Sequence, residues 1–309
     1  MTKDDQRVVK FGNVVVNLDF YGGRDEYTDG DIEDKILDFV RRDLSFSQAL
    51  AEDSSWPVVY HLSPVRENLL SWYPFEKGCR ILEIGAGCGA VTGVLCDHGG
   101  DVVANELSRR RAEILATRHR ERDNLRVYVG NLNEIKFCKP FDVVTLVGVL
   151  EYAERFTDSH RPYIDFLKRI RGLIRPGGRL LIAIENRFGL KYWSGAREDH
   201  TSLFFDGIEG YQRGTEARTF SRSELAEIIN FAGLRVEQFY YPMPDYKMPI
   251  QVFSDRALPA RGDLETHVPN YQAGSFKLFD EDAAFEGLID LGLFPFFANS
   301  FLVDCRVDD

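Results

Sequence analysis

Short apolar runs alternate with segments of helical periodicity through the middle of the chain. Residues 80–84 and 141–149 are apolar enough for strands buried on both faces, and 91–98 and 108–120 carry apolar side chains at helical spacing. Such alternation predicts a parallel sheet covered by helices on both faces, with right-handed crossovers. The predicted strands are 80–84, 101–106, 125–129, 141–149, 179–185, 234–241 and 300–307, and the predicted helices are 91–98, 108–120, 162–174 and 221–232.

The regular pattern is flanked by two segments of different character. Residues 1–55 combine a β-rich stretch with one amphipathic helix, which predicts an N-terminal extension or cap. Residues 56–309 then form the α/β domain. Within that domain 241–297 holds many prolines and aromatic residues and is far longer than a normal connection between two strands, so we expect an inserted segment there.

Composition narrows the class of protein. The chain has 309 residues, of which 44% are hydrophobic and 28% charged, as in ordinary globular proteins. Its net charge of −11 argues against nucleic acid as a partner, because phosphate backbones attract basic surfaces. No apolar stretch reaches the roughly 20 residues of a membrane span. Five cysteines without a CxxC pair favour reduced thiols over disulfides or a zinc site, which predicts a cytoplasmic protein.

The strongest local motif is Glu-Ile-Gly-Ala-Gly-Cys-Gly at 83–89, directly after a predicted strand and before a predicted helix. Its glycines allow a tight turn and close approach of a ligand to the backbone, and the helix start offers free N–H groups. Glu106 ends the next strand, where a carboxylate can accept hydrogen bonds from both hydroxyls of a ribose. The two features together predict a nucleoside-containing cofactor across the carboxyl ends of these strands.

Two classes of cofactor fit this motif. Gly85, Gly87 and Ala90 also satisfy the spacing of the dinucleotide fingerprint, which leaves an NAD(P) site open. Glu83 favours S-adenosylmethionine, because its carboxylate could reach the amino group of the methionine part and would repel a pyrophosphate. Gly89 suits an uncharged ribose that passes over the loop.

These motifs, with Leu150-Glu151-Tyr152 after the fourth strand and Arg-Pro-Gly-Gly-Arg-Leu-Leu at 175–181, resemble class I S-adenosylmethionine-dependent methyltransferases over about residues 60–240. A narrower resemblance, to methyltransferase domains of bacterial surface-polysaccharide biosynthesis proteins, rests on the strings at 60–66, 184–193, 198–201 and 241–247. The resemblance implies S-adenosyl-L-methionine as cofactor. It also implies a doubly wound, Rossmann-like sheet of seven strands, the last antiparallel, with an N-terminal extension and a C-terminal insertion on the acceptor side.

The resemblance assigns cofactor contacts to the turns at the strand ends. The glycine-rich loop would bind the methionine and ribose parts, and the end of the next strand would bind the ribose and adenine. Many family members have Asp where this chain has Asn131, although an Asn carbonyl can also accept from the adenine amino group. The implied cofactor-binding residues are Glu83, Gly85, Ala86, Gly87, Gly89, Glu106, Leu107, Asn131, Leu132, Gly148 and Val149.

Methyl transfer to a hydroxyl requires an aligned acceptor and removal of the hydroxyl proton. The sulfonium donor is already activated, so no metal is predicted. His200 is the predicted general base, because the ordinary pKa of histidine lies near working pH and the residue follows the fifth strand in an irregular aromatic stretch. Glu185 is the second predicted catalytic residue, with Asp199 and Glu151 as further candidates.

The predicted function is O-methylation of a sugar or phosphorylated saccharide in surface-glycan biosynthesis. Three alternatives stay open: methylation of another small metabolite, a non-catalytic methyltransferase-like subunit, and an NAD(P)-dependent oxidoreductase. The predicted partners are a small-molecule or saccharide acceptor and a kinase-like or glycosyltransferase protein. The sequence leaves open the methylated atom, the oligomeric state and whether the chain is a piece of a longer multidomain protein.

Overall fold

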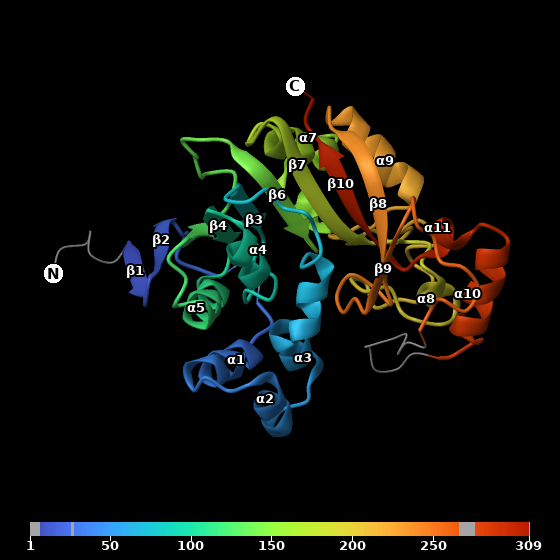
Figure 1. Cartoon of the computed structure of the whole chain (residues 1–309), viewed down its shortest axis with the longest axis horizontal. Helices are drawn as coiled ribbons and strands as arrows, with labels where there is room; N and C mark the ends of the chain where they lie inside the picture. Colours follow the sequence, from blue (N-terminus) through green and yellow to red (C-terminus); the bar gives the residue numbers. More distant parts are fainter. Residues whose placement is uncertain (1–6, 26–27, 266–275, 309) are drawn as a thin grey trace. The chain divides into compact units, whose positions relative to one another are not determined.

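The computed structural model describes residues 7–25, 28–265 and 276–308 (Figure 1). The chain divides into two compact units, 1–145 and 146–309. In the first unit the strands lie in the order β1-β2-β5-β4-β3-β6, with β3, β4 and β5 parallel to one another. Its elements are β1 (Val8–Phe11), β2 (Val14–Phe20), α1 (Ile32–Arg41), α2 (Phe46–Glu52), α3 (Trp56–Leu62), the 3₁₀-helix η2 (Pro64–Leu69), β3 (Arg80–Ile84), α4 (Thr92–His98), β4 (Asp101–Glu106), α5 (Arg109–Arg118), β5 (Leu125–Gly130) and β6 (Phe141–Val147), at whose end the unit boundary falls.

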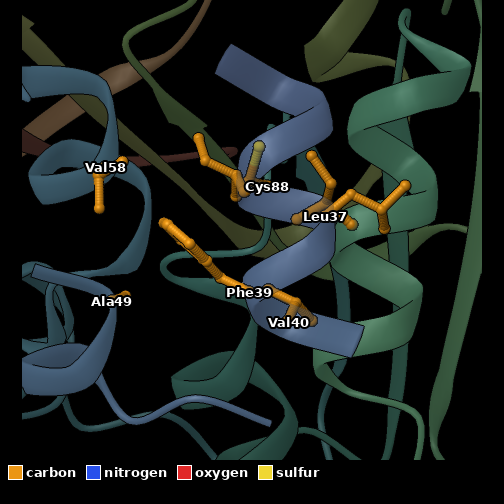
Figure 2. Close-up of a cluster of buried hydrophobic side chains, with 8 residues drawn as sticks. Leu37, Phe39, Val40, Ala49, Val58 and Cys88 are labelled. Atoms are coloured by element: carbon orange, nitrogen blue, oxygen red, sulfur yellow. The ribbon is translucent and has the colours of Figure 1, made fainter. Parts of the chain in front are cut away.

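The N-terminal extension continues this sheet and covers one of its helices. Strand β2 pairs in parallel with β5, so the β1–β2 hairpin extends the sheet beyond β5. Helix α1 presents Ile36, Phe39 and Val40 at helical spacing, and these side chains pack in a buried cluster with Val58 of α3 and Ile114 of α5 (Figure 2). The extension is therefore part of the hydrophobic core of the first unit.

A buried ion pair holds the same helices together. The Arg111 guanidinium donates to the carboxylates of Glu33 and Asp29 at 2.7 Å each, and Asp29 also accepts from His61 at 2.9 Å. Glu33 is fully buried, so Arg111 compensates a charge that has no access to water.

The second unit contains the remaining strands in the order β7-β10-β8-β9, with β10 antiparallel to both of its neighbours. Helices α7 and α9 pack against each other, as do α10 and α11. Its elements are η3 (Leu150–Tyr152), α6 (Ala153–Phe156), α7 (Pro162–Arg171), β7 (Ile174–Glu185), α8 (Leu190–Trp193), α9 (Arg222–Phe231), β8 (Arg235–Met243), β9 (Gln251–Ser254), α10 (Glu281–Asp290), α11 (Phe294–Phe297) and β10 (Ser300–Arg306).

The predicted elements of the α/β domain are present, including seven strands and the antiparallel last one. Ser108 caps α5, and Ser221 with Glu224 forms the capping box of α9. One boundary was wrong: β7 begins at Ile174, inside the predicted helix, and the Arg-Pro-Gly-Gly run at 175–178 belongs to this strand. Two backbone hydrogen bonds hold this run in the strand: the Gly177 N–H donates to the Val307 carbonyl, and the Val307 N–H donates to the Gly178 carbonyl.

The predicted insertion at 241–297 contains β9, α10 and α11, which the sequence did not predict, and its residues 266–275 lie outside the described part of the chain. Among the described residues we find no helix with the length and apolarity to cross a bilayer.

Candidate functional site

The glycine-rich loop joins β3 to the turn before α4 in the first unit. Gly85, Gly87 and Gly89 all have positive φ, between 55° and 78°, which explains the repeated glycines. The N–H groups of Gly85 and Ala86 both donate to the Asn105 carbonyl, at 2.9 and 3.1 Å, so the loop is tied to the end of β4. A Cβ atom added to Gly87 would meet nothing within 4 Å, so the space beside this backbone is open to a ligand.

Glu106 closes the neighbouring strand and reaches the same loop. One of its carboxylate oxygens accepts from the Gly87 N–H at 2.8 Å, and the other accepts from the Ser108 N–H at 2.9 Å. Burial raises the pKa of this carboxyl group. The structure therefore brings together the glycine turn and the acidic strand end, the two features on which the predicted cofactor site depends.

Glu83 lies at the start of the loop with its side chain buried. Its carboxylate accepts a hydrogen bond of 2.6 Å from the Thr92 hydroxyl of α4. Burial, with a smaller contribution from the charge of Glu106, raises the pKa of Glu83 to about 8 against the opposing effects of Thr92 and Arg66. A ligand ammonium group is the kind of partner that would stabilise the ionised form.

The turn after β5 holds the next predicted contacts. Asn131 is half-buried, and its side-chain oxygen accepts from the Asn133 N–H at 2.9 Å, so in this structure it stabilises its own turn. Leu132 is buried, while Leu107 after β4 is half-buried. Their roles toward adenine stay predictions.

The second unit holds the other two predicted cofactor residues, Gly148 and Val149, directly after β6. Gly148 has φ +67°, and its N–H donates to the Ala183 carbonyl of β7 at 3.0 Å. A Cβ atom at Gly148 would lie 2.9 Å from the Tyr246 hydroxyl and 3.6 Å from a Glu151 carboxylate oxygen. Gly148 is thus packed against Tyr246 and Glu151.

Glu151, Glu185 and His200 form one group, which we call the acid–histidine cluster. One ligand atom from each of the three side chains lies within 4.8 Å of the others, and His200 Nε2 is 3.7 Å from Glu185 Oε2. Glu151 and Glu185 are 1% and 0% exposed, and the His200 side chain is 10% exposed. The two predicted catalytic residues therefore lie together, and Glu151, a further candidate, joins them.

His200 is fixed from its other nitrogen and from its backbone. Nδ1 shares a hydrogen bond of 3.1 Å with the Tyr152 hydroxyl, and the N–H groups of His200 and Thr201 both donate to Glu198 at 2.7 Å. Burial alone would lower the pKa of His200, but the surrounding carboxylates, Glu185 first, raise it to about 9. Burial and the charge of Glu185 raise the pKa of Glu151 to about 8.

Lys191, which is buried, and Lys247, which is half-buried, pair with the remaining carboxylates of this region. Lys247 lies 2.5 Å from Glu185 Oε1 and 2.6 Å from Asp199, and Lys191 lies 2.8 Å from Asp199 and 3.5 Å from Asp245. Although burial opposes ionisation, Lys247 keeps the pKa of Glu185 below its usual range, and both lysines do so for Asp199. Asp199, a further candidate for the base, is thus occupied by two ammonium groups.

Sequence reasoning missed Tyr152, Tyr246, Lys191 and Lys247 as parts of the site. A sequence feature could have pointed to Tyr246 and Lys247. The string Tyr-Pro-Met-Pro-Asp-Tyr-Lys at 241–247 places charged residues in an otherwise apolar segment. Their contact with Glu185, 61 or more residues away in sequence, could not be inferred from spacing alone.

Residues 82–180 match a family model described as a methyltransferase domain. A ubiquinone biosynthesis O-methyltransferase of Coxiella burnetii is 30% identical over 129 residues, which are 41% of this chain and 52% of that protein. The enzyme of the same name from Rickettsia felis is 25% identical over 142 residues, 44% of this chain and 55% of that protein. The chain spans about half the length of the curated relatives that it matches.

Among solved structures, a chain in the complex between the Haloferax volcanii Trm112 methyltransferase activator and a methyltransferase is similar in fold. The TM-score is 0.51 at 16% identity, over 90% of this chain and 98% of that one. The predicted Rossmann-like methyltransferase fold is therefore confirmed. Residues 82–180 are thus similar to a methyltransferase domain, and S-adenosylmethionine is the methyl donor that the sequence motifs predict.

The raised pKa of Glu83 predicts a pH-dependent affinity for S-adenosylhomocysteine, the demethylated cofactor. Below pH 8 this carboxyl group is largely protonated and cannot pair with the ligand ammonium group, so affinity should rise by up to about tenfold per pH unit from pH 6. The increase should end near pH 8, above which Glu83 is already ionised in the free protein. Isothermal titration calorimetry at several pH values measures this profile.

The matched pair for this experiment is Glu83→Gln and Glu134→Gln, the second at an exposed residue of the same unit. Glu83→Gln should bind weakly with a flat profile between pH 6 and 7, whereas Glu134→Gln should keep the wild-type slope. If the affinity of Glu83→Gln for S-adenosylhomocysteine still rises with pH, the group that titrates is not Glu83.

Proposed function

We propose that this protein is an S-adenosylmethionine-dependent O-methyltransferase that methylates a hydroxyl of a sugar or phosphorylated saccharide. The observation that carries the O-methyl assignment is the acid–histidine cluster beside Gly148, a residue predicted to lie near the sulfonium. A hydroxyl acceptor must lose a proton, and the groups of this cluster that can accept it are the ionised carboxylate of Glu185 and the imidazole of His200 in its neutral form. An acceptor hydroxyl has polar partners there, because each of the three side chains keeps one buried polar atom without a partner among the described residues.

The saccharide acceptor rests on the sequence strings shared with polysaccharide-biosynthesis methyltransferase domains, especially those at 184–193 and 241–247. The residues of these strings now have positions: Glu185 lies in the cluster, and Tyr246 and Lys247 hold its carboxylate. A second candidate comes from the names of the relatives, which are O-methyltransferases of ubiquinone biosynthesis. On that hypothesis the acceptor is a hydroxylated ring compound of that pathway.

In this proposal one set of residues binds the cofactor and another set lies beside the acceptor. Glu83 would pair with the cofactor ammonium group, and Glu106 would accept from the ribose hydroxyls, exchanging its present bonds to Gly87 and Ser108 for them. S-adenosylmethionine, once bound, supplies an activated methyl group. Glu185 stays ionised beside Lys247, and Tyr152 orients the imidazole of His200 so that Nε2 faces the carboxylates. The assignment of His200 as the base stays a prediction.

Incubation with ¹³C-methyl-labelled S-adenosylmethionine tests the proposal. The acceptor panel contains nucleotide sugars, phosphorylated saccharides, glycan fragments and hydroxylated ring compounds, and NMR reads the position of the label. We expect an O–¹³CH₃ signal on a saccharide. A signal on a ring hydroxyl would favour the second candidate. Label on nitrogen or carbon would contradict O-methylation, and cofactor binding without any transfer would favour the non-catalytic subunit.

A further inference from the structure

We propose that Glu151, Glu185 and His200 bind a divalent transition-metal ion such as Mn²⁺, which holds the acceptor hydroxyl. The binding of the ion concerns the chain alone, whereas its contact with an acceptor hydroxyl rests on the proposed function. Its basis is that one ligand atom from each of the three side chains lies within 4.8 Å of the others. An ion that binds each atom at roughly 2.1 Å fits between atoms up to about 4.2 Å apart, so the side chains need only close slightly around it.

The three groups are buried and incompletely satisfied. Glu151 Oε2, Glu185 Oε2 and His200 Nε2 are each buried and have no hydrogen-bond partner among the described residues. Buried polar atoms normally have partners, because an unpaired one costs about 1–3 kcal/mol, more when it is charged. Glu185 Oε2 and His200 Nε2 lie 3.7 Å apart, beyond hydrogen-bond distance, so their contact does not satisfy either atom. Three such atoms in a single cluster indicate a missing ligand rather than three independent defects.

Neighbouring side chains already hold the opposite end of two of these groups. The Tyr152 hydroxyl bonds His200 Nδ1, which leaves Nε2 as the free nitrogen. Lys247 and the Tyr246 hydroxyl both approach Glu185 Oε1, at 2.5 and 3.2 Å, which leaves Oε2 free. Metal-binding histidines and carboxylates are typically oriented in this way by hydrogen bonds on their non-ligating atoms.

The chemistry of the donors and the local charge favour a dication. One imidazole nitrogen with two carboxylate oxygens suits Mn²⁺, Fe²⁺, Co²⁺ or Zn²⁺ better than the all-oxygen preference of Ca²⁺. The region contains five carboxyl groups, Glu151, Glu185, Glu198, Asp199 and Asp245, against two ammonium groups, Lys191 and Lys247. A bound ion would displace the protons of Glu151 and His200, and the five carboxylates would then exceed the two ammonium groups by three negative charges, which a dication reduces to one.

A bound cation gives His200 a different role from the one predicted from sequence. As a ligand through Nε2, the imidazole is not free to accept a proton. The acceptor hydroxyl would instead bind the cation, which lowers its pKa, and its proton would pass to water. The resulting alkoxide or phenolate oxygen is the nucleophile that methyl transfer requires.

Manganese binding tests the site without any acceptor. Protein freed of metal with EDTA is titrated with MnCl₂ and followed by electron paramagnetic resonance. We expect one Mn²⁺ per chain, with electron spin echo modulation from a single histidine nitrogen. No binding up to about 1 mM Mn²⁺ or Zn²⁺, or binding without the nitrogen signal, would overturn the proposal.

Variants locate the ion. Glu151→Gln and His200→Ala should each weaken Mn²⁺ binding by about 100-fold or more, and His200→Ala should lose the nitrogen modulation. Glu227→Gln, at an exposed carboxylate of α9, should bind Mn²⁺ as the wild type does. Unchanged affinity for S-adenosylhomocysteine shows that the variants are folded. Equal Mn²⁺ binding by all of them would mean adventitious binding and would contradict the site.

The two proposals fail in different ways. If methyl transfer proceeds at full rate in EDTA and the protein binds no Mn²⁺, the metal site is wrong and the proposed function stands. If the chain binds Mn²⁺ at these residues but methylates no hydroxyl in the panel, the metal site stands and the proposed function is wrong.

Discussion

Gly87→Val should weaken the binding of S-adenosylhomocysteine by more than about 100-fold. A side chain at this position would extend into space that has no protein atom within 4 Å of the added Cβ, next to the N–H that Glu106 now binds. If this space receives the ribose, valine occupies it, and the backbone can no longer approach the ligand. Isothermal titration calorimetry on purified, ligand-free protein measures the loss.

A matched control separates this effect from backbone strain. Gly78 also has a positive φ, +76°, and open space around the added Cβ, but it lies in the loop before β3. A valine costs about 1–2 kcal/mol at either glycine for conformational reasons. Gly78→Val should therefore lose similar stability and keep cofactor affinity within about twofold. Similar affinity losses in both variants would remove the evidence for a ligand over Gly87.

His200→Ala should lower the rate of methyl transfer by about 10² to 10⁴, the range of a lost proton-transfer group. A loss at least this large also follows if His200 is a metal ligand, because its removal dismantles the same cluster. Single-turnover assays with saturating S-adenosylmethionine give the rate. Affinity for S-adenosylhomocysteine should stay within about twofold, because Glu83, Gly87 and Glu106 are unchanged.

The control for this variant is His160→Ala, at an exposed histidine of the same unit, in the loop before α7. It should methylate at the wild-type rate. Near-normal turnover of His200→Ala would exclude both the base and the metal-ligand role, and the search for the acceptor site would then move away from the acid–histidine cluster.

The contact between the glycine-rich loop and Glu106 could be predicted because its parts are local in sequence. The loop at 83–89 is one strand–turn–helix unit, and Glu106 ends the strand that pairs with β3. In a parallel sheet the carboxyl ends of paired strands lie at the same edge, so two short motifs suffice to place both groups together. The antiparallel β10 followed from the family resemblance and is confirmed.

The acid–histidine cluster could be predicted only in part, because it depends on contacts between distant segments. His200 and Glu185 are 15 residues apart, but Lys247 comes from the segment after β8 and no spacing rule links it to either. Lysine and aspartate side chains usually face water, so the low exposure of Lys191, Lys247 and Asp199 is visible only in the folded chain. The run at 175–178 misled for a similar reason, since Pro-Gly-Gly is typical of a turn but here pairs with Val307.

A crystal structure with S-adenosylhomocysteine tests the central claim most directly. We predict the ribose hydroxyls at hydrogen-bond distance from the Glu106 carboxylate, the adenosine beside Gly87, and the ligand ammonium group at Glu83. A ribose away from Glu106, or a site at these residues that takes a pyrophosphate in preference to S-adenosylhomocysteine, would contradict the account.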